Sequence, residues 1–309
     1  MRVFVTGASG HIGSAVVPEL LQAGHQVVGL ARSDQSAAAL EAAGAEVRRG
    51  DLDDLDGLRE AAAAADGVIH LAFKHEAMRV GAFMDAVDAD LQAIQALGDG
   101  LADSGKPFVS TSGTLMLARG GIVGRAGTED DVVEAGPRVD AENHVIALAD
   151  RGVRSSIVRL PPIVHSDIDH HGFLPILIGV AGETGVAGYV GDGANRWPAV
   201  HTRDAAHVYR LALESAPAGT RLHAVADEGV PFRAIAEGIG AQLGVPTASI
   251  AADAATEQFA FLGGFVGLDG PTSSARTRAL LGWEPAYPGL IADIEAGHYF
   301  EVSAPSPTS

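Results

Sequence analysis

The sequence predicts an α/β fold, in which a doubly wound parallel sheet is followed by a smaller C-terminal region. Three observations support this prediction. Short runs rich in Val, Ile and Phe alternate with longer Ala-rich stretches over the first 160 residues, a glycine-rich segment follows the first run, and the alternation stops after Leu160. Because parallel strands need a crossover connection, usually a helix, such alternation is typical of a parallel sheet.

Six strands are expected in the alternating part, and each ends on polar or glycine-rich residues. In an open parallel sheet the ligand binds at this end of the strands. The expected strands span residues 2–6, 26–31, 46–49, 67–72, 108–111 and 156–160. Helices are expected between them over residues 11–23, 36–43, 54–64, 82–104 and 138–151.

The composition narrows the functional class. The 309 residues carry a formal net charge of −18 and no Cys, and 47% of them are hydrophobic. The hydrophobic fraction excludes a wholly disordered chain, and the absence of an apolar run of about 18 residues excludes a membrane span. The acidic excess disfavours nucleic-acid and membrane partners, and the lack of Cys excludes disulfides and thiolate chemistry. Because the first residues lack the apolar core of a secretory signal, we expect a cytoplasmic protein.

A glycine-rich segment, Thr6-Gly7-Ala8-Ser9-Gly10-His11-Ile12-Gly13, directly follows the first strand and opens the first helix. Glycines in this setting permit a tight turn and let the backbone approach a pyrophosphate, which lies at the N-terminus of the helix. The motif therefore predicts a dinucleotide site, with contacts from Gly7, Ser9, Gly10, His11, Ile12 and Gly13.

The end of the second strand indicates which dinucleotide binds. Enzymes that use NAD place Asp or Glu here to hold the ribose 2′-hydroxyl, whereas this chain has Arg32 and Ser33. A guanidinium group can bind a 2′-phosphate through two parallel hydrogen bonds, so the sequence favours NADPH over NADH. The neighbouring Asp34 would partly offset this preference.

After Leu160 the pattern changes. Residues 161–198 are rich in Pro and Gly and predict loops and short elements, while a helix is expected over 201–216 and a strand over 221–226. We expect a Rossmann-type NADP-binding domain over residues 1–165, to which 201–226 return. Residues 166–200 and 227–302 are expected to form a substrate-binding region, and 303–309 have the composition of a disordered tail.

Further motifs extend the pattern over most of the chain. They are Gly50-Asp51-Leu52, His70-Leu71-Ala72, Val109-Ser110-Thr111-Ser112, Arg159-Leu160-Pro161-Pro162, Gly191-Asp192-Gly193, Val200-His201-Thr202-Arg203-Asp204 and Leu281-Gly282-Trp283-Glu284-Pro285. With the TGxxGxxG loop, they make the chain similar to the extended short-chain dehydrogenase/reductases, the NAD(P)-dependent epimerase/dehydratase-like group.

The resemblance implies a set of cofactor contacts. Asp51 and Leu52 would flank the adenine, and Leu71, Ala72 and Phe73 would line the nicotinamide ribose. The segment after Arg159 would touch the carboxamide. The expected set is completed by Lys74, Ser110, Thr111 and Pro161.

The chain departs from this family in its catalytic signature. Family enzymes use a Tyr as proton donor and a Lys four residues later, but no such pair exists here, since the only lysines are Lys74 and Lys106. Counting back from Arg159 by the family's spacing places Glu142 at the usual downstream Glu, Arg138 at the Lys and Glu134 at the Tyr. The chain thus resembles an atypical member.

Other side chains are candidates for catalysis. Ser112 and Thr114 stand where the family keeps its hydroxyl, at the end of the fifth strand. Arg138 could polarise a carbonyl oxygen, and Glu134, His165 or His201 could transfer a proton. No metal site is expected, because the adjacent His170 and His171 lack the spacing of helical metal ligands.

These observations predict an NADPH-dependent oxidoreductase, of the ketoreductase kind, that reduces a carbonyl or a related C=N or C=C bond of a small, largely apolar molecule. A nucleotide-sugar epimerase or dehydratase is an alternative, because Arg196 matches a family position that can hold a diphosphate. A non-catalytic NADP sensor is a second alternative. A homodimer is compatible with the sequence, which leaves the natural substrate and the proton donor open.

Overall fold

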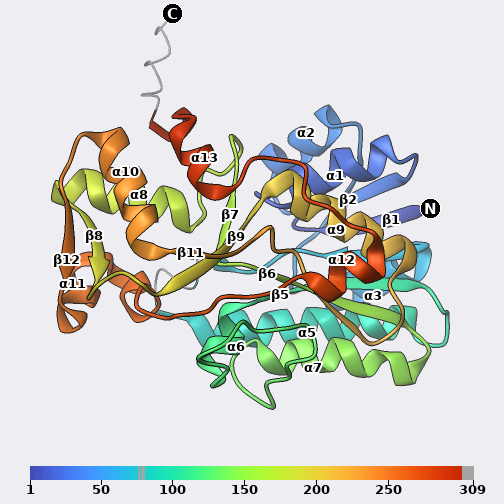
Figure 1. Cartoon of the computed structure of the whole chain (residues 1–309). Helices are drawn as coiled ribbons and strands as arrows, with labels where there is room; N and C mark the ends of the chain where they lie inside the picture. The colour runs from blue at the N-terminus through green and yellow to red at the C-terminus, as the bar shows by residue number, and fades with distance from the viewer. Residues whose placement is uncertain (76, 78–80, 301–309) are drawn as a thin grey trace, which may run out of the picture.

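The computed structural model describes residues 1–75, 77 and 81–300, so the expected tail at 303–309 lies outside the described residues. Its main feature is a seven-stranded parallel sheet with the strand order β10-β6-β5-β4-β1-β2-β3 (Figure 1). The strands are β1 Arg2–Thr6, β2 Gln26–Ala31, β3 Glu46–Arg49, β4 Gly67–His70, β5 Pro107–Gly113, β6 Arg154–Leu160 and β10 Thr220–His223. This order confirms the doubly wound α/β fold that the sequence predicts.

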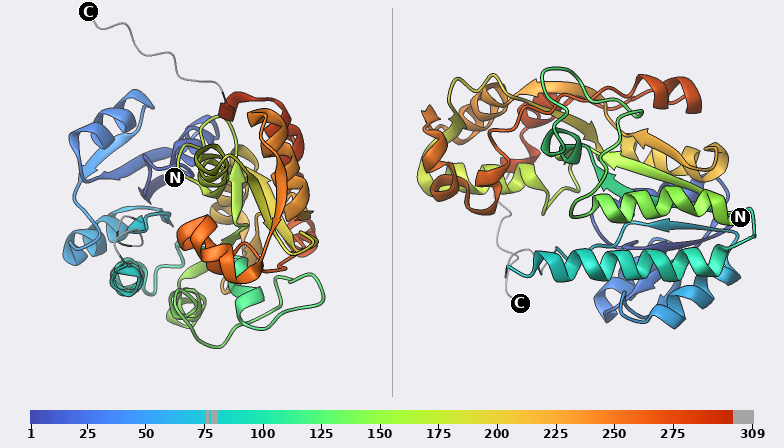
Figure 2. Two further views of the ribbon diagram at one scale, coloured as in Figure 1. Left: turned by 90° about the vertical axis from the view of Figure 1, so that its left-hand side faces the viewer. Right: turned by 90° about the horizontal axis from the view of Figure 1, so that it is seen from below.

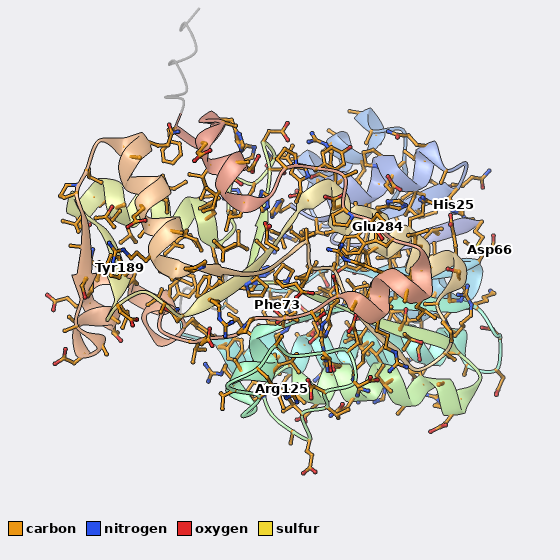
Figure 3. The ribbon with its side chains drawn as sticks, in the orientation of Figure 1. His25, Asp66, Phe73, Arg125, Tyr189 and Glu284 are labelled. Carbon is orange, nitrogen blue, oxygen red and sulfur yellow. The ribbon has the colours of Figure 1, made fainter. Side chains whose placement is uncertain are left out.

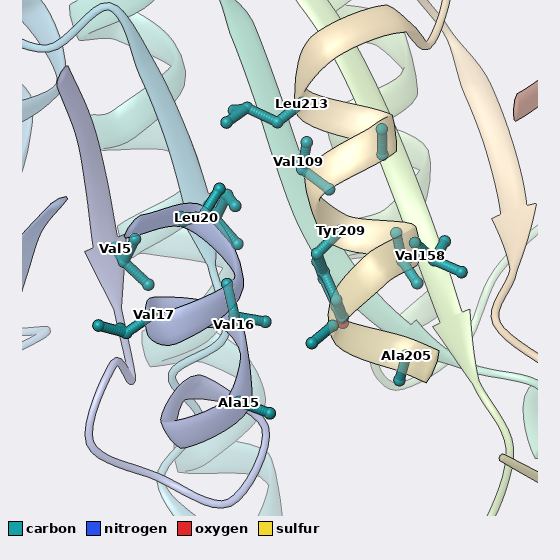
Figure 4. Packing of buried hydrophobic residues seen from close by; sticks show 14 of the residues in the cluster. Val5, Ala15, Val16, Val17, Leu20, Val109, Val158, Ala205, Tyr209 and Leu213 are labelled. Atoms are coloured by element: carbon teal, nitrogen blue, oxygen red, sulfur yellow. The ribbon is translucent and has the colours of Figure 1, made fainter. Parts of the chain in front are cut away.

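Helices cover both faces of this sheet. One face carries α1 Gly13–Gln22, α2 Asp34–Ala42 and α9 Thr202–Ser215. The other face carries α3 Leu55–Ala64, α5 Phe83–Leu101 and α7 Val139–Ala147, and Figure 2 shows α5 and α7 side by side. In Figure 4, Val16 and Leu20 of α1 and Tyr209 and Leu213 of α9 lie in the space between the two helices, and all four belong to the core of this face. The core is therefore apolar on both faces, as a parallel sheet requires.

The remaining chain builds a second lobe beside the carboxyl ends of the strands (Figure 1). It contains two small sheets, β11-β9-β7 and β12-β8. Its strands are β7 Ile163–His165, β8 Ala187–Val190, β9 Arg196–His201, β11 Asp227–Pro231 and β12 Thr247–Ile250. Its helices include α8 Phe173–Thr184, α10 Phe232–Leu243, α11 Ala255–Phe259 and α13 Leu290–Glu295. Trp197 and Phe232 lie fully buried at its centre.

Two short helices belong to neither group. Helix α6 Leu115–Arg119 follows β5, and α12 Ala275–Leu281 packs beside α9 and β10. Trp283, just after α12, is fully buried and its Nε1 donates to the carbonyl of Asp204. In the part of the chain that the structure describes, no helix has both the length and the apolar character needed to cross a bilayer.

Residues 161–198, where the sequence predicts loops and short elements, contain the short strands β7 and β8 and the start of β9, together with the 12-residue helix α8, which is longer than expected. Helix α8 was missed because Pro175, Gly179 and Gly182 lower its helix propensity. It is stable in the fold because Pro175 lies in its first turn, where no intrahelical N–H is needed, and because Leu174 and Leu177 are buried in the lobe.

Candidate active site

The glycine-rich loop joins β1 to α1 at the carboxyl edge of the sheet. Gly7 has φ +66°, and a Cβ there would lie 2.7 Å from the backbone nitrogen of Ala72. A Cβ on Gly13 would collide with the carbonyl oxygen of Gly7. Gly10 differs, because only the Gly7 oxygen, 3.3 Å away, lies near its Cβ position. Packing within the chain thus requires Gly7 and Gly13, whereas Gly10 leaves open space beside the backbone.

The glycine-rich loop also contains unpaired backbone N–H groups. Within the described chain, the N–H groups of His11 and Ile12 have no hydrogen-bond acceptor, although Gly10 N–H donates to the Gly7 carbonyl at 3.0 Å. Free N–H groups before the first turn of α1 are the arrangement that binds a phosphate. The loop therefore fits the pyrophosphate of a dinucleotide, and Ser9, exposed beside Gly10, fits the same group.

The ends of β2 and β3 bring two arginines into one region. Arg32 and Ser33 are exposed after β2, and Ser33 Oγ accepts the Ser36 N–H at 3.1 Å as the N-cap of α2. Arg49 stands opposite Ala31 in the parallel register, donates to the Ser33 carbonyl at 2.5 Å and forms an ion pair with Asp34. The charge of Asp34 is thus balanced by Arg49, a residue that sequence reasoning missed. Its position at the end of the neighbouring strand is the signal that could have found it.

Phe73 and Lys74 follow β4 and take part in different contacts. Lys74 Nζ donates to both carboxylate oxygens of Asp53 at 2.6 and 2.7 Å. Phe73 lies beneath the guanidinium of Arg138, with 4.0 Å from Cζ to the ring centroid. Figure 3 shows Phe73 between the large sheet and the second lobe. The aromatic ring therefore marks the place where the two parts of the molecule meet.

The other residues expected at the cofactor lie along the same sheet edge. Ala72 N–H donates to Thr6 Oγ1 at 3.3 Å, next to the half-buried Leu71. Thr111 Oγ1 donates to the His70 carbonyl at 2.9 Å. Asp51 is exposed, whereas Leu52, Ser110 and Pro161 are buried.

Arg138 stands at the N-terminus of α7 with φ +66°, an unfavourable backbone conformation for a non-glycine residue. Its Nη2 donates to the carbonyl oxygen of Thr111 at 3.2 Å, and its guanidinium stacks on Phe73. Strained residues persist only where surrounding contacts hold them, and they cluster at functional sites. The ends of β4 and β5 thus fix a cationic group where the family resemblance implies a lysine.

Ser112 and Thr114 lie buried beside this group. Thr114 Oγ1 has no hydrogen-bond partner among the described residues. Ser112 lies near the Glu142 carboxylate, close enough to lower its pKa although no hydrogen bond of standard geometry forms. Burial opposes ionisation of Glu142, but Arg159, with a 2.5 Å contact from Nη2 to Oε1, and Arg221 hold its pKa below the usual range. A buried ion network thus supports the end of β5 from behind.

The remaining catalytic candidates, Glu134, His165 and His201, have different surroundings. Glu134 is exposed in the loop before α7, and its backbone carbonyl accepts a hydrogen bond from Asn143 at 3.1 Å. His165 is fully buried, with Nδ1 2.8 Å from Asp293. His201 caps α9 and stacks on Tyr287, and burial lowers its pKa to about 4. Arg138 thus contacts the end of β5 through Thr111, Ser112 and Thr114 follow Thr111 along the chain, and the two histidines occupy a second cluster.

Comparison with known proteins agrees with this geometry. A model of the NAD dependent epimerase/dehydratase family matches residues 3–129. An uncharacterized protein of Schizosaccharomyces pombe is 46% identical over 302 residues, covering 97% of this chain and 100% of the relative. An uncharacterized protein of Saccharomyces cerevisiae is 45% identical over 302 residues, with 96% and 99% coverage. The 2-alkyl-3-oxoalkanoate reductase of Stenotrophomonas maltophilia is 28% identical over 263 residues, covering 80% of this chain and 77% of that protein.

Solved structures share the fold at low identity. The dTDP-glucose 4,6-dehydratase of Streptomyces venezuelae matches with TM-score 0.76 and 21% identity, covering 96% of each chain. The UDP-glucose 4-epimerase of Thermotoga maritima matches with TM-score 0.78 and 17% identity, covering 97% of this chain and 98% of the other. The chain therefore belongs to the NAD-dependent epimerase/dehydratase family of extended short-chain dehydrogenase/reductases, as an NAD(P)-dependent enzyme with an atypical active site.

Proposed function

We propose that the protein is an NADPH-dependent reductase of a carbonyl, or of a related C=N or C=C bond, in a small and largely apolar molecule. The position of Arg138 is the observation that carries this proposal. Its guanidinium is held between the Thr111 carbonyl and the Phe73 ring, at the strand ends where a dinucleotide presents its nicotinamide. A fixed cation at this point can stabilise the negative charge that develops on a carbonyl oxygen.

Residues of the chain would stabilise the developing negative charge and supply the proton. When bound, the reduced nicotinamide supplies a hydride to the carbonyl carbon. Arg138 and the Thr114 hydroxyl, which is buried without a partner, donate hydrogen bonds to the oxygen as it gains the electron pair. Ser112 completes this donor set, and the proton that the oxygen takes up comes from one of the two hydroxyls or from water.

The preference for NADPH rests on the charges after β2 and β3. Arg32 and Arg49 lie in this region, and the neighbouring carboxylate of Asp34 pairs with Arg49. A 2′-phosphate would meet two guanidinium groups there, whereas an NAD-specific site needs a free carboxylate for the 2′-hydroxyl. The ion pair thus removes the offset that Asp34 alone would impose on phosphate binding.

The charges of residues 161–300, which build the second lobe and also α9, β10 and α12, favour an uncharged substrate over a nucleotide sugar. Arg196 donates from Nε and Nη2 to Asp269 at 3.0 and 2.8 Å. Its guanidinium group is therefore already bound to a carboxylate through two hydrogen bonds. Residues 161–300 contain seven Arg, no Lys and 15 Asp or Glu. Each of these seven arginines forms an ion pair with a carboxylate. A nucleotide diphosphate would have to displace such a partner.

The reductase among the relatives supports reduction of a carbonyl group, since its printed name describes a 2-alkyl-3-oxoalkanoate, a carboxylate that carries a ketone and alkyl chains. The nucleotide-sugar alternative draws on the names of the solved dehydratase and epimerase, which share only the fold at 21% and 17% identity. A non-catalytic NADP sensor is the third candidate, because the Tyr and Lys of the family are absent.

A cofactor-consumption screen separates the three candidates. The protein is incubated with NADPH and panels of apolar ketones, aldehydes, imines, enones and nucleotide sugars, with the Gly10→Val variant as the control for cofactor-independent signals. We expect NADPH oxidation with an apolar carbonyl, imine or enone and none with nucleotide sugars. Epimerases and dehydratases leave the cofactor unchanged overall, so nucleotide sugars are also incubated with NAD and analysed by chromatography. A converted nucleotide sugar would favour the epimerase or dehydratase, whereas binding of NADPH with neither NADPH oxidation nor conversion of a nucleotide sugar would favour the sensor.

A further inference from the structure

The side chain of His11 leaves the glycine-rich loop and enters a buried polar cluster of the second lobe. Its Nε2 lies 2.9 Å from Thr202 Oγ1, at the start of α9. Its Nδ1 lies 3.5 Å from Oδ1 of Asp169, whose side chain is 0% exposed. The loop expected to hold the pyrophosphate is thus tied to residues far away in the sequence.

The hydrogen bonds around Thr202 fix the proton on His11. Thr202 has one hydroxyl proton, which it donates to the His165 carbonyl at 3.2 Å, and it accepts from Ser166 Oγ at 2.8 Å. Its remaining lone pair can only accept, so His11 Nε2 must be the donor. A neutral His11 protonated on Nε2 has a bare lone pair on Nδ1, and that lone pair faces Asp169.

Asp169 also presents only lone pairs to His11 when it is ionised. Its Oδ1 accepts the Gly172 N–H at 2.7 Å, and its Oδ2 accepts from the Tyr299 hydroxyl at 3.4 Å. Two lone pairs facing each other in a buried site repel, so the contact becomes favourable when one additional proton lies between Nδ1 and Oδ1.

We propose that His11 and Asp169 form a proton-sharing pair that positions the glycine-rich loop and takes up one proton when the cofactor binds. The proposal rests on dinucleotide binding at that loop. A bound pyrophosphate adds negative charge next to the His11 backbone, and negative charge stabilises the protonated form of the pair. The added proton in turn closes the bond from His11 to Asp169 and holds the loop in place.

The titration of the two groups places this uptake near neutral pH. Burial raises the pKa of Asp169 to about 6 and lowers the pKa of His11 to about 4. Without cofactor the pair therefore lacks the shared proton above about pH 6. The other titratable groups around the pair are His165 with Asp293, His170, His171, Tyr299, and the ion pair of Asp167 with Arg203.

Calorimetric titration tests the proposal. The protein is titrated at pH 7 with NADPH and with NADH, which lacks the titratable 2′-phosphate, in buffers of different ionisation enthalpy. The dependence of the heat on the buffer gives the protons taken up. Asp169→Asn is the matched variant, because its amide N–H can donate to Nδ1 in place of the shared proton. Asp293→Asn removes a different buried carboxyl and leaves the pair intact.

We expect the natural protein and Asp293→Asn to take up close to one proton more than Asp169→Asn with both cofactors. Between pH 6 and 8 the Kd of the natural protein should rise, by up to about tenfold per pH unit, while that of Asp169→Asn stays flatter. His11→Phe, which keeps an aromatic ring but no nitrogen, should also lose the uptake. Equal uptake in the natural protein, Asp169→Asn and His11→Phe would overturn the pair, whereas absence of binding of both cofactors to every protein would overturn the proposed function itself.

Discussion

Replacing Arg138 with Gly should separate catalysis from stability. The substitution removes a guanidinium that donates to the Thr111 carbonyl at 3.2 Å and stacks on Phe73 at 4.0 Å. Loss of the cation–π contact costs about 0.5–1 kcal/mol, while relief of the strained backbone at φ +66° returns about 1–2 kcal/mol. The free energy of unfolding should therefore stay unchanged or rise by up to about 1.5 kcal/mol. Removing a preorganised oxyanion donor lowers a rate by about 10²–10³-fold.

The assay is single-turnover oxidation of NADPH with an accepted substrate, beside urea unfolding of the same samples. Asp103→Gly is the matched control, because Asp103 has a similar backbone conformation, φ 57°, in the connection between α5 and β5. This variant should gain stability and keep the natural rate. Arg138→Lys should be intermediate, because an ammonium group lacks the planar stacking surface. An Arg138→Gly enzyme within threefold of the natural rate would refute the role of this residue.

Substitutions of the two buried hydroxyl residues, Ser112 and Thr114, are tested in the same assay. Ser112→Ala and Thr114→Val should each lower kcat and leave the Kd for NADPH nearly unchanged, since both lie beside Arg138 rather than at the glycine-rich loop. His165→Ala and His201→Ala serve as comparators, because the structure places these histidines in a different buried cluster. If the histidine variants lose turnover and the hydroxyl variants keep it, the reacting face lies in the second cluster.

Three further predictions follow from the described contacts. Arg32→Glu should shift the ratio of the NADPH and NADH Kd values toward NADH by about 10- to 100-fold, through loss of a charge-assisted bond of about 1.5–3 kcal/mol, and an unchanged ratio by fluorescence titration would contradict this role. Gly10→Val should abolish cofactor binding with little change in Tm, whereas Gly13→Val should lower Tm because its side chain meets the Gly7 carbonyl. Glu142→Gln should destabilise the fold by about 3–5 kcal/mol at pH 7 by leaving Arg159 with a neutral partner. Because the folded pKa of Glu142 is lowered, its contribution is present above the unfolded pKa and is lost as pH falls through the folded value, so urea titrations should show the two proteins converging in acid.

The first half of the fold could be predicted because its signals are local. The strands expected at 2–6, 26–31 and 46–49 have the same bounds in the structure, since short β-branched or apolar runs end at polar or glycine residues. Helix bounds were less accurate, with 82–104 expected against Phe83–Leu101 and 36–43 against Asp34–Ala42, because propensity alone does not fix the capping contacts. Helix α8 could not be recognised, because burial in the lobe offsets the low propensity of its Pro and Gly residues.

In the candidate site, too, some features could be predicted from the sequence and others could not. The glycine-rich loop and Arg138 follow from motif and spacing, which are properties of neighbouring residues. The pairing of Asp34 with Arg49 depends on the order of strands β2 and β3, and the contact of His11 with Asp169 depends on how the lobe packs against the loop. Side-chain contacts between distant segments therefore could not be predicted from the sequence.

Transfer of deuterium from NADPH that carries deuterium at both hydrogen positions of nicotinamide C4 tests the central claim most directly. The labelled cofactor is incubated with the natural protein and the best compound of the screen, and the product is analysed by mass spectrometry. We predict one deuterium on the former carbonyl, imine or alkene carbon for each NADPH oxidised, with the Arg138→Gly enzyme forming the same product more slowly. NADPH that binds to the protein and keeps its deuterium with every compound would contradict the reductase.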